Sequence, residues 1–118
     1  MALLENIVKK ISSPFDRAKA YYTILFTVNS IPFSPIELDM IAFTAVNGTL
    51  SSPPLRDEFL STFKISRNYF NMTLPKLRKR GIMVKGDDKK MRLSPILQRD
   101  FSGHILLHLN ILKDEDTQ

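Results

Sequence analysis

The side chains best suited to chemistry in this chain are cations that gather in one stretch. Residues 64–92 contain ten lysines and arginines and only two acids, Asp87 and Asp88, whereas the rest of the 118-residue chain is slightly acidic and the net charge is +5. A basic segment on a faintly acidic body is typical of a surface that binds a polyanion. A solvated lysine-rich surface would carry the same charge, so charge alone leaves both interpretations open.

The spacing of residues inside this stretch predicts one helix with two different faces. We expect the helix over about 66–80, with Ser66 as its cap. Phe70, Leu74 and Leu77 recur at helical spacing and should face the core. The residues on the opposite side are of types that contact DNA. Asparagine can hydrogen-bond to adenine, and lysine and arginine can bind guanine or phosphate. Methionine can make an apolar contact with the methyl group of thymine. The candidate DNA-contacting residues of this helix are Arg67, Asn68, Asn71, Met72, Lys76, Arg78 and Lys79.

Pro75 interrupts this helical pattern. A proline there removes the hydrogen bond to the Asn71 carbonyl and tends to kink the helix, at a cost of about 3 kcal/mol. Together with Met72, it also makes the predicted exposed face less polar than a usual base-reading face.

Two short apolar runs after this helix predict a β-hairpin. They are residues 82–85 and 91–93, and the polar segment between them contains Gly86. We interpret Asp87 and Asp88 as turn residues neutralised by the lysines that follow. Cations on or beside the hairpin could contact the phosphate backbone or the minor groove. These candidates are Lys85, Lys89, Lys90 and Arg92.

No catalytic or metal-binding set accompanies the basic stretch. The absence of cysteine excludes disulfides, thiol catalysis and cysteine-ligated zinc. His104 and His108 fall on a predicted strand, which would hold them about 13 Å apart. Neither GxxxxGK[ST] nor GxGxxG occurs in the sequence. We therefore expect no enzyme activity, no metal and no cofactor.

The elements before the basic stretch begin with strong helix signals. Residues 34–37, Ser-Pro-Ile-Glu, form a capping box with proline at the first helical position, and predict a helix to Val46. Asn47 and Gly48 suit its end. A shorter helix is expected from Ser52 or Pro53 to about residue 62.

The spacing of apolar residues predicts the elements at the start of the chain. Residues 2–11 predict an amphipathic helix, and residues 13–16 look like a second helix start. Residues 21–29 alternate and favour a strand, with a continuous helix over 14–28 as the alternative.

After the hairpin, residues 94–101 predict one helical turn, and 104–112 alternate as a second strand. We expect the two strands to pair with each other, to extend the hairpin sheet, or to form an oligomer interface. The tail, 113–118, should be frayed.

The order of helix, short helix, helix and basic hairpin resembles the winged helix-turn-helix superfamily. The matching stretch, residues 59–82, reads FLSTFKISRNYFNMTLPKLRKRGI and looks like the second helix, turn, recognition helix and wing entry of MarR-type domains. With the preceding helix and the hairpin, the resemblance covers about residues 34–97. It implies an α+β domain with a winged helix-turn-helix core, flanked here by residues 1–33 and 98–112. It also implies that the recognition helix and the wing bind double-stranded DNA.

We therefore expect one domain over residues 1–118, acting as a small DNA-binding protein. The roles that fit are a transcriptional regulator or a replication or packaging accessory. The alternative is a structural or assembly protein, in a virion or another complex, that docks on protein and associates through its terminal apolar elements. No apolar run reaches the length of a membrane span, and the N-terminus lacks the order of a signal peptide. The expected location is the cytoplasm, or the virion or host cytoplasm for a phage protein.

Overall fold

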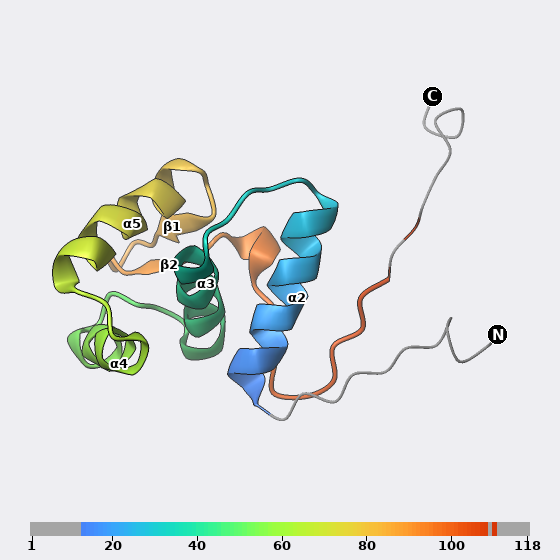
Figure 1. The fold of residues 1–118 in the computed structure, drawn as a ribbon, viewed down its shortest axis with the longest axis horizontal. Coiled ribbons are helices and arrows are strands. Elements are labelled where there is room, and N and C mark those ends of the chain that lie inside the picture. The colour runs from blue at the N-terminus through green and yellow to red at the C-terminus, as the bar shows by residue number, and fades with distance from the viewer. Residues whose placement is uncertain (1–12, 109, 111–118) are drawn as a thin grey trace.

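The computed structural model describes residues 13–108 and 110, which form an α+β fold (Figure 1). Within this range, four α-helices precede a two-stranded antiparallel hairpin and a single 3-10 turn. The elements are α2 (Pro14–Val28), α3 (Pro35–Asn47), α4 (Pro53–Phe63), α5 (Arg67–Lys79), β1 (Met83–Lys85), β2 (Met91–Leu93) and η1 (Pro95–Leu97).

The predicted helix starts in the middle of the chain are confirmed. The Ser34 hydroxyl accepts from the Glu37 N–H at 3.2 Å, and the Glu37 carboxylate accepts from the Ser34 N–H at 2.7 Å. This reciprocal capping box satisfies two N–H groups that the first turn of α3 leaves unpaired. Gly48 follows α3 with a φ of 89°, a conformation that favours glycine. The Ser66 hydroxyl likewise caps α5 by accepting from the Tyr69 N–H.

The strand predicted over residues 21–29 is wrong, because this segment belongs to helix α2. Ala18, Tyr22 and Phe26 are spaced by four and are fully buried, whereas Ile24 and Val28 are exposed. The alternation in the sequence therefore mixes one buried helical face with two exposed apolar residues. Helical spacing lets α2 bury its aromatic rings against α3, which outweighs the strand propensity of its side chains.

The terminal strands are also wrong as far as the structure describes them. Residues 104–108 and 110 are in no strand, and the sheet within the described range contains only β1 and β2. The C-terminal strand was predicted to pair with one of two partners. The first, residues 21–29, is helical. The other, the free edge of β2, is partly occupied by side chains: Met91 donates its N–H to Ser51 Oγ and accepts from Thr49 Oγ1.

The predicted helical turn after the hairpin is shorter than expected. It ends at Leu97, and Gln98 is already extended, so the turn does not reach Phe101. The helix predicted over 2–11 and the tail predicted over 113–118 lie outside the described residues.

Helix α3 occupies the middle of the fold, between α2 on one side and α4 with α5 on the other (Figure 1). Two groups of aromatic rings fill the spaces beside it. On the α4–α5 side, the Phe59 ring lies 5.3 Å from Phe43 and 6.0 Å from Phe70. On the α2 side, the Tyr22 ring lies 5.5 Å from Phe101. None of the helices in the described part is long and apolar enough to cross a membrane.

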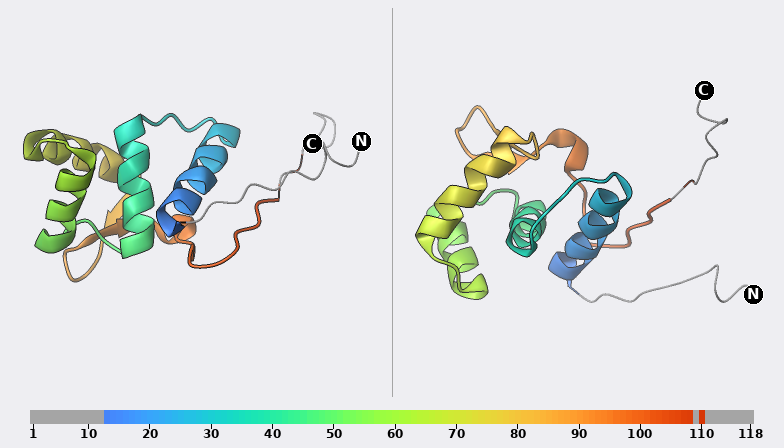
Figure 2. Two further views of the ribbon diagram at one scale, coloured as in Figure 1. Left: turned by 60° about the horizontal axis from the view of Figure 1, so that its bottom comes forward. Right: turned by 45° about the horizontal axis from the view of Figure 1, so that its top comes forward.

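Side chains of the hairpin pack into this core. Its strands pair Met83 with Leu93 and Lys85 with Met91, and three of these four side chains are buried. In every view the hairpin lies with α4 and α5 at one end of the fold, and α2 lies at the other (Figure 2). The basic stretch of the sequence is therefore collected at one end.

Candidate nucleic-acid interface

Helix α5 has the two faces that its sequence predicts. Phe70 and Leu77 are buried and Leu74 is half-buried, so this side packs on the core. Thr73 is buried as well, which the sequence did not predict; its hydroxyl donates to the Tyr69 carbonyl at 2.9 Å. All seven candidate contact residues of this helix are exposed to solvent: Arg67, Asn68, Asn71, Met72, Lys76, Arg78 and Lys79.

Sequence reasoning missed one residue of this surface, Tyr69. It is the third residue of α5, and 50% of it is exposed although it is a large aromatic residue. The sequence did contain a signal for its exposure. Tyr69 is three residues from both Ser66 and Met72, and residues three apart are neighbours on the surface of a helix.

Pro75 does not end the helix. Helix α5 continues past it to Lys79, and the proline itself is exposed. Because proline has no N–H, the carbonyl of Asn71 loses its usual helical donor. That carbonyl belongs to the solvent-facing side, where water or a bound ligand can donate to it.

The Arg67 side chain is held by an acid from the neighbouring helix. Its guanidinium lies 3.4 Å from the Asp57 carboxylate of α4, and both side chains are more than half exposed. Exposed pairs of this kind contribute little to stability. The pair therefore leaves Arg67 available to a stronger anion at modest cost.

The hairpin turn contains a tighter ion pair. The Arg92 guanidinium donates two hydrogen bonds to Asp88, at 2.7 and 2.5 Å, and the Lys90 N–H donates a third at 3.1 Å. These contacts, with the Arg92 side chain contributing most, hold the pKa of Asp88 well below its usual value. The ion-pair partner of Asp88 is therefore Arg92, and of the two lysines expected to neutralise the turn, Lys90 contributes a smaller electrostatic effect.

The remaining candidate cations have no such partner. Within residues 13–108 and 110, the exposed candidates that form no ion pair are Lys76, Arg78, Lys79, Lys85, Lys89 and Lys90. They lie on α5 and the hairpin, two elements that contact each other. Exposed cations without an ion-pair partner can neutralise phosphates and so bind DNA with release of its counterions.

Arg80 differs from the other cations of the basic stretch. Its guanidinium lies 3.3 Å from the Glu37 carboxylate at the start of α3 and also donates to the Pro32 carbonyl. The side chain thus joins the end of α5 to the start of α3. These two contacts tie the guanidinium to the protein and position the end of the helix.

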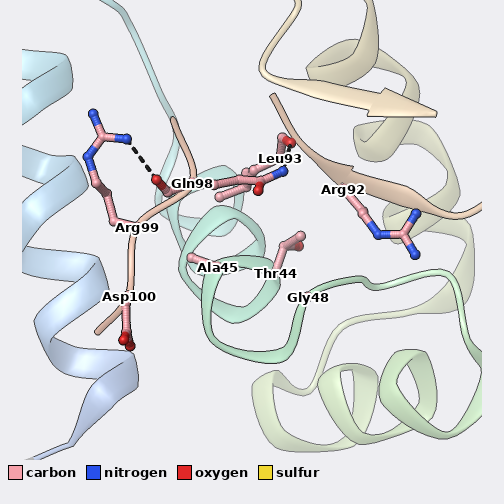
Figure 3. A pocket seen from close by; sticks show the side chains of 8 residues that line it. All are labelled: Thr44, Ala45, Gly48, Arg92, Leu93, Gln98, Arg99 and Asp100. Atoms are coloured by element: carbon pink, nitrogen blue, oxygen red, sulfur yellow. Dashed lines mark hydrogen bonds between the residues drawn. The ribbon is translucent and has the colours of Figure 1, made fainter. Parts of the chain in front are cut away.

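A pocket of about 440 Å³ lies between α3, β2 and residues 98–100 (Figure 3). Its charged groups are committed to neighbours: Arg92 bonds to Asp88, Arg99 donates to the Tyr21 hydroxyl and to the Ile96 and Gln98 carbonyls, and Asp100 accepts from Ser102. In Figure 3, the polar ends of Arg92, Arg99 and Asp100 diverge and do not meet at one point. The lining residues are Thr44, Ala45, Gly48, Arg92, Leu93, Gln98, Arg99 and Asp100.

In the described part of the chain, no three histidine or acidic side chains gather as metal ligands. His104 and His108, predicted to share a strand face, are both exposed and lie in a segment without regular secondary structure.

Comparisons with family models, with curated proteins and with solved structures find no match to this chain.

Proposed function

We propose that the protein is a winged helix-turn-helix DNA-binding protein that contacts duplex DNA through α5 and the hairpin. The helix α5 presents its polar side to solvent and is fixed from behind by Phe70 and Leu77. The hairpin follows directly and packs against it. This arrangement supports a recognition helix for the major groove and a wing for the backbone beside it.

The observation that carries the proposal is the group of six exposed cations without an ion-pair partner on α5 and the hairpin. Outside the basic stretch, the Lys19–Asp39 and Arg56–Asp57 contacts pair a cation with an acid. Unpaired cations concentrated on two adjacent elements favour a polyanionic partner.

The two asparagines are the residues that we expect to contact bases. Asn68 and Asn71 are exposed in the first half of α5, the half from which recognition helices usually reach base edges. Their amide groups can pair with adenine through one donor and one acceptor. The roles that we propose are transcriptional regulation or an accessory function in DNA replication or packaging.

A second candidate function, docking on a partner protein, is favoured by one observation. Tyr69 and Met72 are exposed apolar residues on α5, and Pro75 is exposed one turn later. A fold of this kind can serve either purpose. A structural or assembly protein that uses this surface would require Met72 and would not require the hairpin lysines.

Two double variants test the proposal. Replacing Asn68 and Asn71 with alanine should weaken a preferred duplex by about 1–3 kcal/mol and leave random duplexes nearly unchanged. Replacing Lys89 and Lys90 with alanine should weaken all duplexes alike and lower the salt slope by about two units. The control is Lys19→Ala, which removes a cation from α2 at the other end of the fold and should bind every duplex as the parent does. If both double variants also bind every duplex as the parent does, the proposed surface is wrong.

A further inference from the structure

Two apolar side chains lie inside the polar face of α5. Met72 is 59% exposed and Tyr69, three residues before it, is 50% exposed. On a helix, the neighbours of Met72 are the residues three and four positions away, which include Asn68 and Lys76. By this spacing, Met72 lies beside the Tyr69 ring, an amide, the exposed Pro75 and a cation.

Tyr69 and Met72 are not needed to pack α5 against the core. Phe70 and Leu77 already fill the buried side of α5, and the Tyr69 ring takes part in none of the aromatic pairs found among the described residues. Single exposed apolar residues are common on protein surfaces. Two adjacent ones on a helix that also carries unpaired cations instead favour a partner that combines negative charge with a small apolar group.

Duplex DNA has this combination. Its backbone is anionic, and the 5-methyl group of thymine is the apolar group that the major groove presents at a base edge. Methionine is flexible and polarizable, which suits contact with such a group. The unpaired cations Lys76 and Lys79, on the same helix, supply the charge complementarity for the backbone.

We propose that Met72, supported by the Tyr69 ring, contacts a thymine 5-methyl group and makes the protein select thymine at that position. This inference rests on the proposed DNA-binding function. It adds an apolar contact to the hydrogen bonds expected from the asparagines, and it assigns Met72 a role in specificity.

The test replaces thymine with uracil, which pairs identically and lacks only the methyl group. A duplex enriched by selection from a random pool is remade with uracil, and binding of both forms is measured by fluorescence anisotropy. Since burying one methyl-sized group contributes about 0.8 kcal/mol, the parent should lose affinity about fourfold for each contacted methyl. Met72→Gln keeps the side-chain length and should bind both duplexes equally. Ile96→Gln, at an exposed apolar residue outside α5, should keep the parent's preference.

The outcomes separate this inference from the proposed function. If the parent binds thymine and uracil duplexes equally, while its binding stays salt-dependent, the methyl contact is refuted and DNA binding stands. The same holds if Met72→Gln retains the full preference. If the parent binds no duplex at low salt, the proposed function itself fails, and Met72 with Tyr69 becomes the surface to test for protein docking.

Discussion

The rotation of α5 about its own axis decides which residues face a ligand, and one pair of substitutions measures it. Phe70 is 2% exposed and its ring lies 6.0 Å from that of Phe59. Truncating a buried phenylalanine removes its transfer free energy and leaves a cavity, so Phe70→Ala should lower the free energy of unfolding by about 3–5 kcal/mol. For a chain of this length, that corresponds to a fall in the melting midpoint of roughly 12–20 °C.

Met72→Ala is the matched change on the opposite side of the same helix. Met72 is exposed, so its truncation should change the free energy of unfolding by less than about 0.5 kcal/mol. Urea unfolding followed by circular dichroism measures both variants under the same conditions. If Phe70→Ala is nearly neutral, or if Met72→Ala costs as much as Phe70→Ala, the helix is rotated differently and the candidate interface is misassigned.

Two further predictions concern local structure. Ser34→Ala removes the acceptor of the capping box at α3 and should lower the free energy of unfolding by about 1 kcal/mol; an unchanged melting midpoint would contradict the role of this cap. Asp88 has a lowered pKa, so its pairing with Arg92 stabilises the fold above about pH 4, the ordinary pKa of aspartate, and this contribution is lost as the pH falls toward the folded-state pKa. Melting midpoints between pH 6 and pH 2 should therefore fall further for the parent than for Asp88→Asn, and parallel curves would refute the pairing.

The helix starts of the middle segment could be predicted because their signals are local. A serine cap, a proline in the first turn and a glutamate at the third position act within residues 34–37, and the structure forms those bonds. The hairpin also follows from local signals, since two short apolar runs flank a polar turn. Most of the exposed side of α5 could be predicted because Phe70, Leu74 and Leu77 mark its inner face, although they do not reveal that Thr73 is buried as well.

Residues 21–29 and, within the described range, residues 104–108 and 110 were mispredicted because the choice there depends on distant partners. Tyr22 and Phe26 have strand propensity, yet as part of a helix both reach the same packed space beside α3. Residues 104–108 alternate in the sequence but find no strand to pair with, and Leu106 is 93% exposed. Propensity and alternation carry no information on which edge is free.

The electrostatics of the candidate site were predictable only in part. Total charge follows from composition, but the pairing of individual cations depends on the folded geometry. Arg80 meets Glu37 across 43 positions of sequence, and Arg92 meets Asp88 across a turn. The cations without an ion-pair partner, Arg78 among them, therefore became distinguishable from the paired ones only in the folded structure.

The most direct test of DNA binding is the salt dependence of the parent protein's affinity for a random-sequence duplex. If about five of the six unpaired cations on α5 and the hairpin contact phosphates, log K plotted against log salt should fall with a slope of about −4 to −5. A slope near zero, or no binding at the lowest salt concentration, would contradict DNA binding by this surface.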